Sequence, residues 1–184
     1  MPRPYQPSLL RLLHALTALA VVAAWSSGLE VYSQYDGRWG RLPWQWPGEW
    51  IDLHGSVGVL LLPVAVLFAL YAIGPGRARL RQPANAAALA ALAVALGSGK
   101  LMQEDWLREG QLHHTVYSLH LCGWLLITAM VIWHVASLLQ RGGLPLAQSI
   151  FQLGWRTQDG PDQWPNQIRT FLRRNRTKSG SRGT

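Results

Sequence analysis

His120 and His134 lie fourteen residues apart inside one apolar segment, which runs from about Gln111 to an Arg-Gly-Gly break at residues 141–143. At about 3.6 residues per turn and about 1.5 Å per residue, this spacing corresponds to nearly four helical turns and roughly 21 Å. Both imidazoles are therefore expected on one face of a single helix, one in each half of a bilayer core about 30 Å thick. Placing an ionisable side chain at this depth costs free energy, so such residues usually mark a functional site. The spacing predicts two stacked ligand sites, each completed by another segment.

The composition indicates a membrane protein. Of the 184 residues, 49% are hydrophobic and 14% are charged, whereas soluble domains contain about 25% charged residues. The net charge of +8 comes mostly from basic residues just outside the apolar segments, which favours anionic lipid head groups as partners and argues against nucleic acid. Cys122 is the only cysteine, which excludes a disulfide framework and a cysteine-rich metal site. We expect it to be a small buried hydrophobic residue.

Four apolar segments are candidates for membrane-spanning helices, each needing about 20 residues. They are Leu9–Leu29, Ile51–Ile73, Pro83–Leu96 extended toward Met102, and the segment that carries His120 and His134. The first could also be a cleavable signal peptide, but its histidine is unusual for a disposable segment. We therefore predict an all-α, integral membrane four-helix bundle at residues 8–141, followed by an amphipathic and basic tail at residues 142–184.

The connections and the tail carry most of the polar residues. Residues 30–50 are rich in Trp and Tyr, which anchor at lipid head groups, so an ordered interfacial cap is expected there. In the tail, a short surface helix is expected from five apolar residues, and the last ten residues are expected to have no fixed structure. The five are Leu146, Ile150, Phe151, Leu153 and Trp155.

The distribution of basic residues predicts the orientation. Thirteen Lys and Arg residues lie on the side of the two termini and of the connection at residues 74–82, and four lie on the opposite side. By the positive-inside rule, both termini are expected in the cytoplasm.

This topology pairs the histidines by depth. His14 lies near the inner end of the first helix, at the level of His134, and His54 lies near the outer start of the second helix, at the level of His120. Two facing imidazoles suit a bis-histidine haem, a low-spin electron-transfer centre without an open ligand position. Hydrogen-bonded packing could explain any single intramembrane histidine, but it explains four residues matched in depth less well.

Three segments resemble the bacterial cytochrome b561 family, which overlaps the cytochrome b subunits of nickel-iron hydrogenases and formate dehydrogenases. They are RLLHALTALA with His14, DLHGSVGVLLL with His54, and HLCGWLLITAMVIWH with His120 and His134. The resemblance covers about Leu9 to Gln140. It implies two haem b groups, an inner one bound by His14 and His134 and an outer one bound by His54 and His120. It also implies exchange of electrons with quinone or quinol, or with a partner redox subunit.

Other assignments concern residues around these sites. Arg11 is the candidate for an inner haem propionate, and Arg38, Lys100 and Arg108 are outer candidates, although such residues more often extend to the lipid interface than bind a propionate. His113 and His114 precede the fourth span and are expected on the solvated surface. The connection from Ser98 to His114 resembles cyanobacterial members. The protein is therefore expected in the plasma membrane, or in the thylakoid membrane if it is cyanobacterial.

The function expected from these features is transmembrane electron transfer, and the residues leave open whether the protein is itself an enzyme. Superoxide oxidation coupled to quinone reduction is disfavoured, because the outer connections hold seven acidic and four basic residues. The alternatives are a chlorophyll-binding protein and an assembly or scaffold protein of a photosynthetic membrane. A homodimer is compatible with every alternative.

Overall fold

The computed structural model describes residues 5–152, 154 and 156–180, with side chains as far as Arg173. The described residues are helical with no strand, and four of the helices are long and apolar enough to cross a membrane. The predicted all-α fold with four membrane helices is thus confirmed. The helices are α1 (Ser8–Val31) with the short extension η1 (Tyr32–Asp36), α2 (Trp50–Ile73), η2 (Arg77–Arg81), α3 (Pro83–Leu101), α4 (Thr115–Ser149), η3 (Pro161–Gln163) and α5 (Trp164–Gly180).

The helix boundaries follow local sequence signals. Pro83 occupies the first turn of α3, where its missing N–H costs no helical hydrogen bond. Gly37 follows η1 with a φ of 66°, a conformation that favours glycine. The fourth helix starts at Thr115 rather than near Gln111, because His114 caps it: its Nδ1 accepts a hydrogen bond from the Val116 N–H at 3.3 Å.

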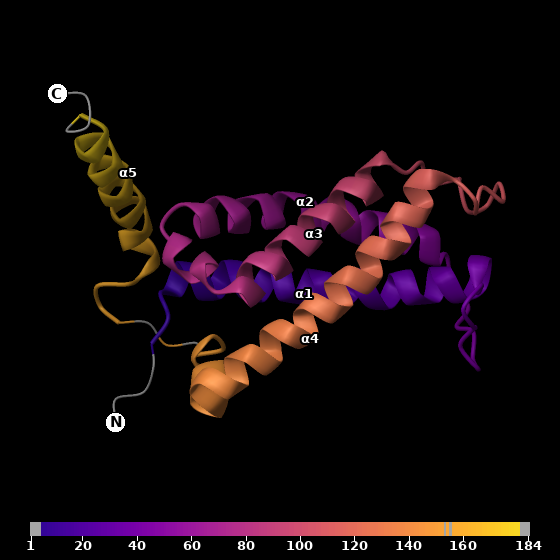
Figure 1. The fold of residues 1–184 in the computed structure, drawn as a ribbon, viewed down its shortest axis with the longest axis horizontal. Helices are drawn as coiled ribbons and strands as arrows, with labels where there is room; N and C mark the ends of the chain where they lie inside the picture. Colours follow the sequence, from indigo (N-terminus) through magenta and orange to yellow (C-terminus); the bar gives the residue numbers. More distant parts are fainter. Residues whose placement is uncertain (1–4, 153, 155, 181–184) are drawn as a thin grey trace.

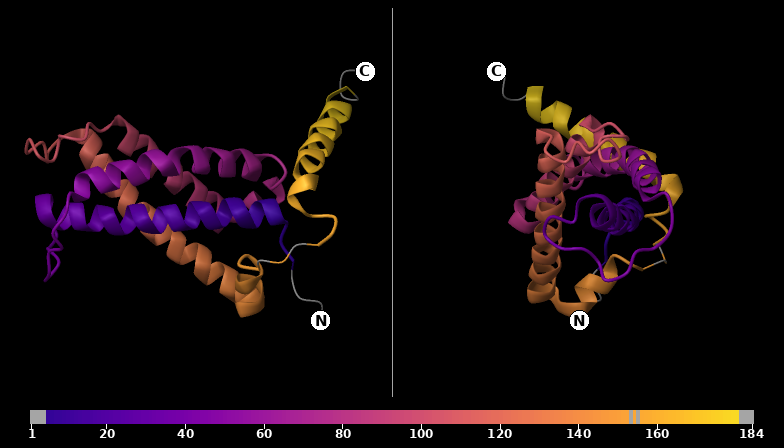
Figure 2. Two further views of the ribbon diagram at one scale, coloured as in Figure 1. Left: turned by 180° about the vertical axis from the view of Figure 1, so that it is seen from behind. Right: turned by 90° about the vertical axis from the view of Figure 1, so that its right-hand side faces the viewer.

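The four long helices form two antiparallel hairpins. α1 packs along α2, α3 packs along α4, and α4 runs at an angle to α1 (Figures 1 and 2). At Gly143 α4 changes direction, with φ 59° and ψ −162°, so the Arg-Gly-Gly segment does interrupt the helix. α5 and the start of α1 lie at the same end of the bundle (Figure 1). The chain thus enters and leaves the bundle at the same end, as an even number of spans requires.

Small residues allow the hairpins to approach closely. The core contains Ala65, Ala91 and Ile127. A Cβ built on Gly123 of α4 would lie 3.2 Å from the Ala95 Cα, so the α3 and α4 backbones nearly touch at this position. Large apolar side chains instead cover the outer surface of the bundle, as expected for helices that face lipid. Cys122 also faces outward, so the prediction that it is buried is wrong.

The tail agrees with its prediction in part. After the change of direction at Gly143, α4 continues as a short helical segment to Ser149 that includes Leu146, whereas Leu153 and Trp155 lie outside the described residues. A second tail helix, α5, was not expected. That helix continues to Gly180, so residues 175–180 of the last ten are helical, contrary to expectation. α5 projects away from the bundle (Figures 1 and 2).

A buried carboxylate fastens the tail to the start of α1. Asp159 Oδ2 accepts hydrogen bonds from the Ser8 N–H at 2.7 Å and from the Tyr5 hydroxyl at 2.6 Å, and Oδ1 accepts one from Gln167 at 3.0 Å. Burial raises the pKa of Asp159, but these hydrogen bonds outweigh it and hold the pKa below its ordinary value. The ionised carboxylate therefore stabilises the docked tail.

We expect Asp159→Asn to loosen the tail. The amide keeps one acceptor oxygen but loses the charge-assisted bonds, which should cost about 1.4 kcal/mol and increase tail opening about tenfold. Limited proteolysis between residues 150 and 163 measures this opening. Asp162→Asn, on the exposed surface of the same connection, is the control. Equal cleavage rates in the two variants would contradict the anchor.

The same anchor depends on pH. The native pKa of Asp159 lies below its ordinary value, so stabilisation is complete above the unfolded-state pKa of about 3.9. It is lost as the pH falls through the lowered native value, because protonation removes the charge that the donors stabilise.

Candidate cofactor sites

The structure brings the four membrane histidines together in the pairs expected from their depth. The ring centroids of His14 on α1 and His134 on α4 are 6.3 Å apart, with an angle of 35° between the rings. Those of His54 on α2 and His120 on α4 are 5.9 Å apart, with an angle of 67°. Helix α4 therefore contributes one histidine to each pair.

The separations match two axial ligands of one metal. A metal–nitrogen bond of about 2 Å and a ring nitrogen about 1.1 Å from its own ring centre put opposed imidazole centroids roughly 6 Å apart. The described residues contain no group of three or more His, Cys, Asp or Glu that could hold a metal ion. A bare ion would therefore lack ligands, whereas a macrocycle that supplies four in-plane nitrogens needs only two from the protein.

An elongated cavity of about 330 Å³ surrounds the pair formed by His54 and His120. Its walls are mainly apolar and include a stack of aromatic rings, in which Trp124 lies 5.5 Å from Trp25 and 6.4 Å from Tyr32 between centroids. The buried Nε1–H of Trp124 has no acceptor among the residues that the structure describes. An apolar cavity with facing histidines and an unpaired donor fits a large, flat, mostly apolar cofactor.

Hydrogen bonds fix the proton on both histidines of the pair formed by His54 and His120. We call this the outer pair, and that of His14 and His134 the inner pair, after the orientation predicted from the sequence. The Ala95 carbonyl lies 3.1 Å from His120 Nδ1, and since a carbonyl can only accept, Nδ1 carries the proton. Ser98 Oγ also lies 3.1 Å from this nitrogen, and Ser27 Oγ lies 3.1 Å from His54 Nδ1. Each imidazole thus keeps Nε2 free for a metal, the arrangement common to metal-binding histidines.

The inner pair has different hydrogen-bond partners from the outer pair. Asn85 Nδ2 donates to the Arg79 carbonyl at 2.8 Å, so its Oδ1 is the atom that faces His134 Nδ1 at 2.9 Å. His134 therefore donates from Nδ1 and also keeps Nε2 free. His14 Nδ1 is buried without a hydrogen-bond partner, and Phe68 packs edge-on against its ring, with centroids 6.0 Å apart.

Arg11 lies beside the tail. Its guanidinium donates to the carbonyls of Gln152 and Gly154, the second at 2.8 Å, and the residue is buried. Among the outer candidates, Lys100 lines the cavity around His54 and His120. Arg108 instead forms ion pairs with Glu49, Asp52 and Asp105, the shortest of which is 2.7 Å, to Asp52 in the first turn of α2.

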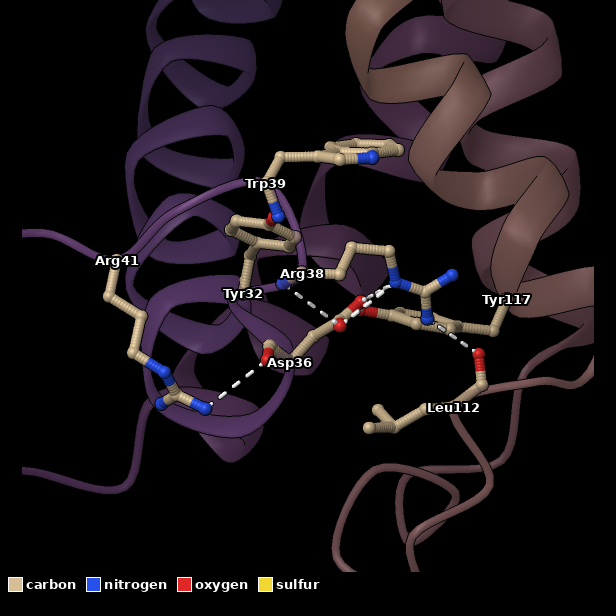
Figure 3. A network of polar contacts seen from close by, with 7 residues as sticks. All are labelled: Tyr32, Asp36, Arg38, Trp39, Arg41, Leu112 and Tyr117. Carbon is tan, nitrogen blue, oxygen red and sulfur yellow. Dashed lines mark hydrogen bonds and ion pairs between the residues drawn. The ribbon is translucent and has the colours of Figure 1, made fainter.

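Arg38 belongs to a polar network that joins the first outer loop to α4 (Figure 3). The side chain of Asp36 is only 2% exposed. Its carboxylate accepts hydrogen bonds from Arg38 Nε at 2.8 Å and from the Tyr117 hydroxyl at 2.8 Å. Arg38 also donates to the Leu112 carbonyl at 2.7 Å. Tyr117 also lines the cavity, so the network lies against one of its walls.

His113 and His114 lie outside both pairs and are exposed, as expected. The side chains that sequence reasoning missed are the partners of the paired histidines: Ser27, Ser98 and Asn85. A Ser-Gly dipeptide at the end of two apolar segments, and a lone Asn in an Ala-rich one, were the available signals.

Four membrane-length helices with histidine pairs facing each other between them define a class of integral membrane proteins with cofactor sites inside the bundle. The family model for prokaryotic cytochrome b561 matches residues 5–144, and the chain belongs to the prokaryotic cytochrome b561 family. Membership implies a b-type haem and electron transfer in the membrane, and it confirms the resemblance noted in the sequence. Comparison with curated proteins and with solved structures gave no match.

Proposed function

We propose that this protein carries single electrons across the membrane through two b-type haems. His14 and His134 hold the inner haem, and His54 and His120 hold the outer one. The observation that carries the proposal is the double use of α4, which places one histidine of each facing pair on one helix, nearly four turns apart. Haem supplies a one-electron couple whose potential the protein tunes through its ligands and their surroundings.

The protein groups suit electron transfer better than substrate chemistry. Each site offers two histidines that would both bind the haem iron, and bis-histidine ligation leaves no iron position for a substrate. The walls of the outer site are mainly apolar, and the hydrogen-bonded Nδ1 atoms keep the imidazole planes fixed. The facing pairs also favour haem over chlorophyll, whose magnesium commonly takes one axial protein ligand.

The remaining assignments follow from the family and from the charge distribution. Quinone or quinol, or a partner redox subunit, exchanges electrons with the haems, and both termini lie in the cytoplasm. The membrane is the plasma membrane, or the thylakoid membrane if the source is cyanobacterial. The basic tail contacts anionic lipid, and two copies can associate through the apolar outer surface.

The role of Arg11 follows its contacts. With its guanidinium on the carbonyls of Gln152 and Gly154, Arg11 fastens the tail to α1 in the observed conformation. Binding an inner propionate requires the guanidinium to exchange these carbonyls for a carboxylate.

Sealed vesicles test transmembrane transfer. Purified protein is reconstituted with ferricyanide trapped inside, and a reductant that cannot cross the bilayer is added outside. The internal ferricyanide should be reduced only in vesicles that contain the haem-loaded protein. Protein with its full haem content that fails to reduce trapped ferricyanide would contradict the proposed transfer.

A further inference from the structure

Two helices carry the same five-residue pattern at the outer histidine pair. Residues 24–28 of α1 read Ala-Trp-Ser-Ser-Gly and residues 95–99 of α3 read Ala-Leu-Gly-Ser-Gly. Both fit the pattern Ala-x-x-Ser-Gly. The α1 segment contacts His54 on α2, and the α3 segment contacts His120 on α4. We infer that this repeat positions the axial ligands of the outer haem, an inference that rests on the proposed function.

The serine of each repeat acts as an acceptor for its histidine. Ser27 Oγ donates to the Ala23 carbonyl at 2.8 Å, and Ser98 Oγ donates to the Val94 carbonyl at 2.7 Å. Because each hydroxyl proton is used within its own helix, the oxygen is left to accept from the Nδ1–H of His54 or His120. The alanine carbonyl of the repeat is the second acceptor, at 3.1 Å for His120, and Ala24 provides the equivalent group for His54.

The glycine of each repeat supports the ring of the same histidine. A Cβ added to Gly28 would lie 3.0 Å from His54 Cε1, and one added to Gly99 would lie 3.1 Å from His120 Cε1. Both distances are shorter than an ordinary carbon–carbon contact of about 3.5–4.0 Å. An alanine at either position would therefore push the imidazole away from the helix and change its distance from the facing ring.

The repeat is specific to the outer site. The inner histidine His134 is held by Asn85, and the Nδ1 of His14 has no partner. The two hairpins thus supply matching Ser-Gly supports to the outer pair, whereas the inner pair has one amide support. Changes in the repeat should consequently affect the outer haem and leave the inner haem unchanged.

Glycine variants provide the first test. In Gly28→Ala and Gly99→Ala, haem content should fall to about half of the wild-type value, with the inner haem signal retained. Gly97→Ala is the matched control, because Gly97 lies on α3, outside the outer cavity, with nothing within 4 Å of an added Cβ. Gly28→Ala and Gly99→Ala proteins that keep full haem and an unchanged outer spectrum would overturn the support role.

Serine variants provide the second test, because they are expected to keep the fold and both haems. When a serine oxygen accepts a hydrogen bond from the Nδ1–H, the imidazole becomes a stronger electron donor to the metal and favours its oxidised state. Ser27→Ala and Ser98→Ala should therefore raise the midpoint potential of the outer haem alone. Ser26→Ala is the matched control, since Ser26 makes the same helical hydrogen bond, to the Val22 carbonyl, but is exposed. An unchanged outer potential, or an equal shift in both haems, would overturn the inference.

These results separate the inference from the proposed function. Wild-type protein without haem would contradict the proposed function itself. Wild-type protein with two haems and insensitive Ser27 and Gly28 variants would contradict only the positioning role of the repeat.

Discussion

Replacing His120 with leucine should lower the haem content from two haems to about one per chain, with the inner haem unaffected. His120 faces His54 with ring centroids 5.9 Å apart, and no other histidine of the described residues faces either ring. Leucine occupies a similar volume but cannot bind a metal, so the outer haem would keep one axial bond at most. Haem extraction from the purified variant, with a redox titration of what remains, measures the loss.

His113→Leu is the control for the His120 variant, because His113 is exposed on the connection before α4. It should keep both haems and both midpoint potentials. A His120→Leu protein with a normal low-spin outer haem, or a His113→Leu protein that loses one, would contradict the assignment of the outer ligands.

Gly123→Leu should destabilise the bundle at the contact between α3 and α4. The Ala95 Cα and N lie 3.2 and 3.4 Å from an added Cβ at this position, and backbone atoms cannot move aside as a flexible side chain can. Overpacking of this kind costs about 1–3 kcal/mol, which corresponds to a fall in Tm of roughly 2–12 °C for a protein of this length. Thermal unfolding in detergent, followed by circular dichroism, measures the change.

Cys122→Leu is the neighbouring control, because Cys122 lies on the outward face of the same helix. It should leave Tm unchanged within about 2 °C. The close approach of α3 and α4 would be contradicted if Gly123→Leu unfolded at the same temperature as Cys122→Leu.

The membrane helices and the histidine pairs were predictable from the sequence because both depend on regular geometry. A span needs about 20 apolar residues, and a helix repeats every 3.6 residues, so His120 and His134 had to share a face. Depth alone then matched them with His54 and His14. The supports of the histidines were not predictable, because Ser27 and Asn85 act across a hairpin whose rotation about the helix axes the sequence does not specify.

The tail shows the other limit of sequence reasoning. Its apolar residues predicted the short helix that follows Gly143 and ends at Ser149, but neither the helix at Trp164–Gly180 nor the hydrogen bond that Asp159 accepts from the Ser8 N–H. Arg11 was expected near the inner site because of its depth, but its side chain reaches the carbonyls of Gln152 and Gly154. Both outcomes depend on contacts about 140–150 residues apart, which no local pattern reports.

The decisive measurement is a reduced-minus-oxidised absorbance spectrum of the purified wild-type protein, with haem quantified per chain. Two facing histidine pairs predict a low-spin b-type spectrum and two haems per chain, which titrate as two one-electron components. A protein purified with no haem, with a chlorophyll spectrum, or with a single haem that survives substitution of either pair would contradict the two-haem arrangement.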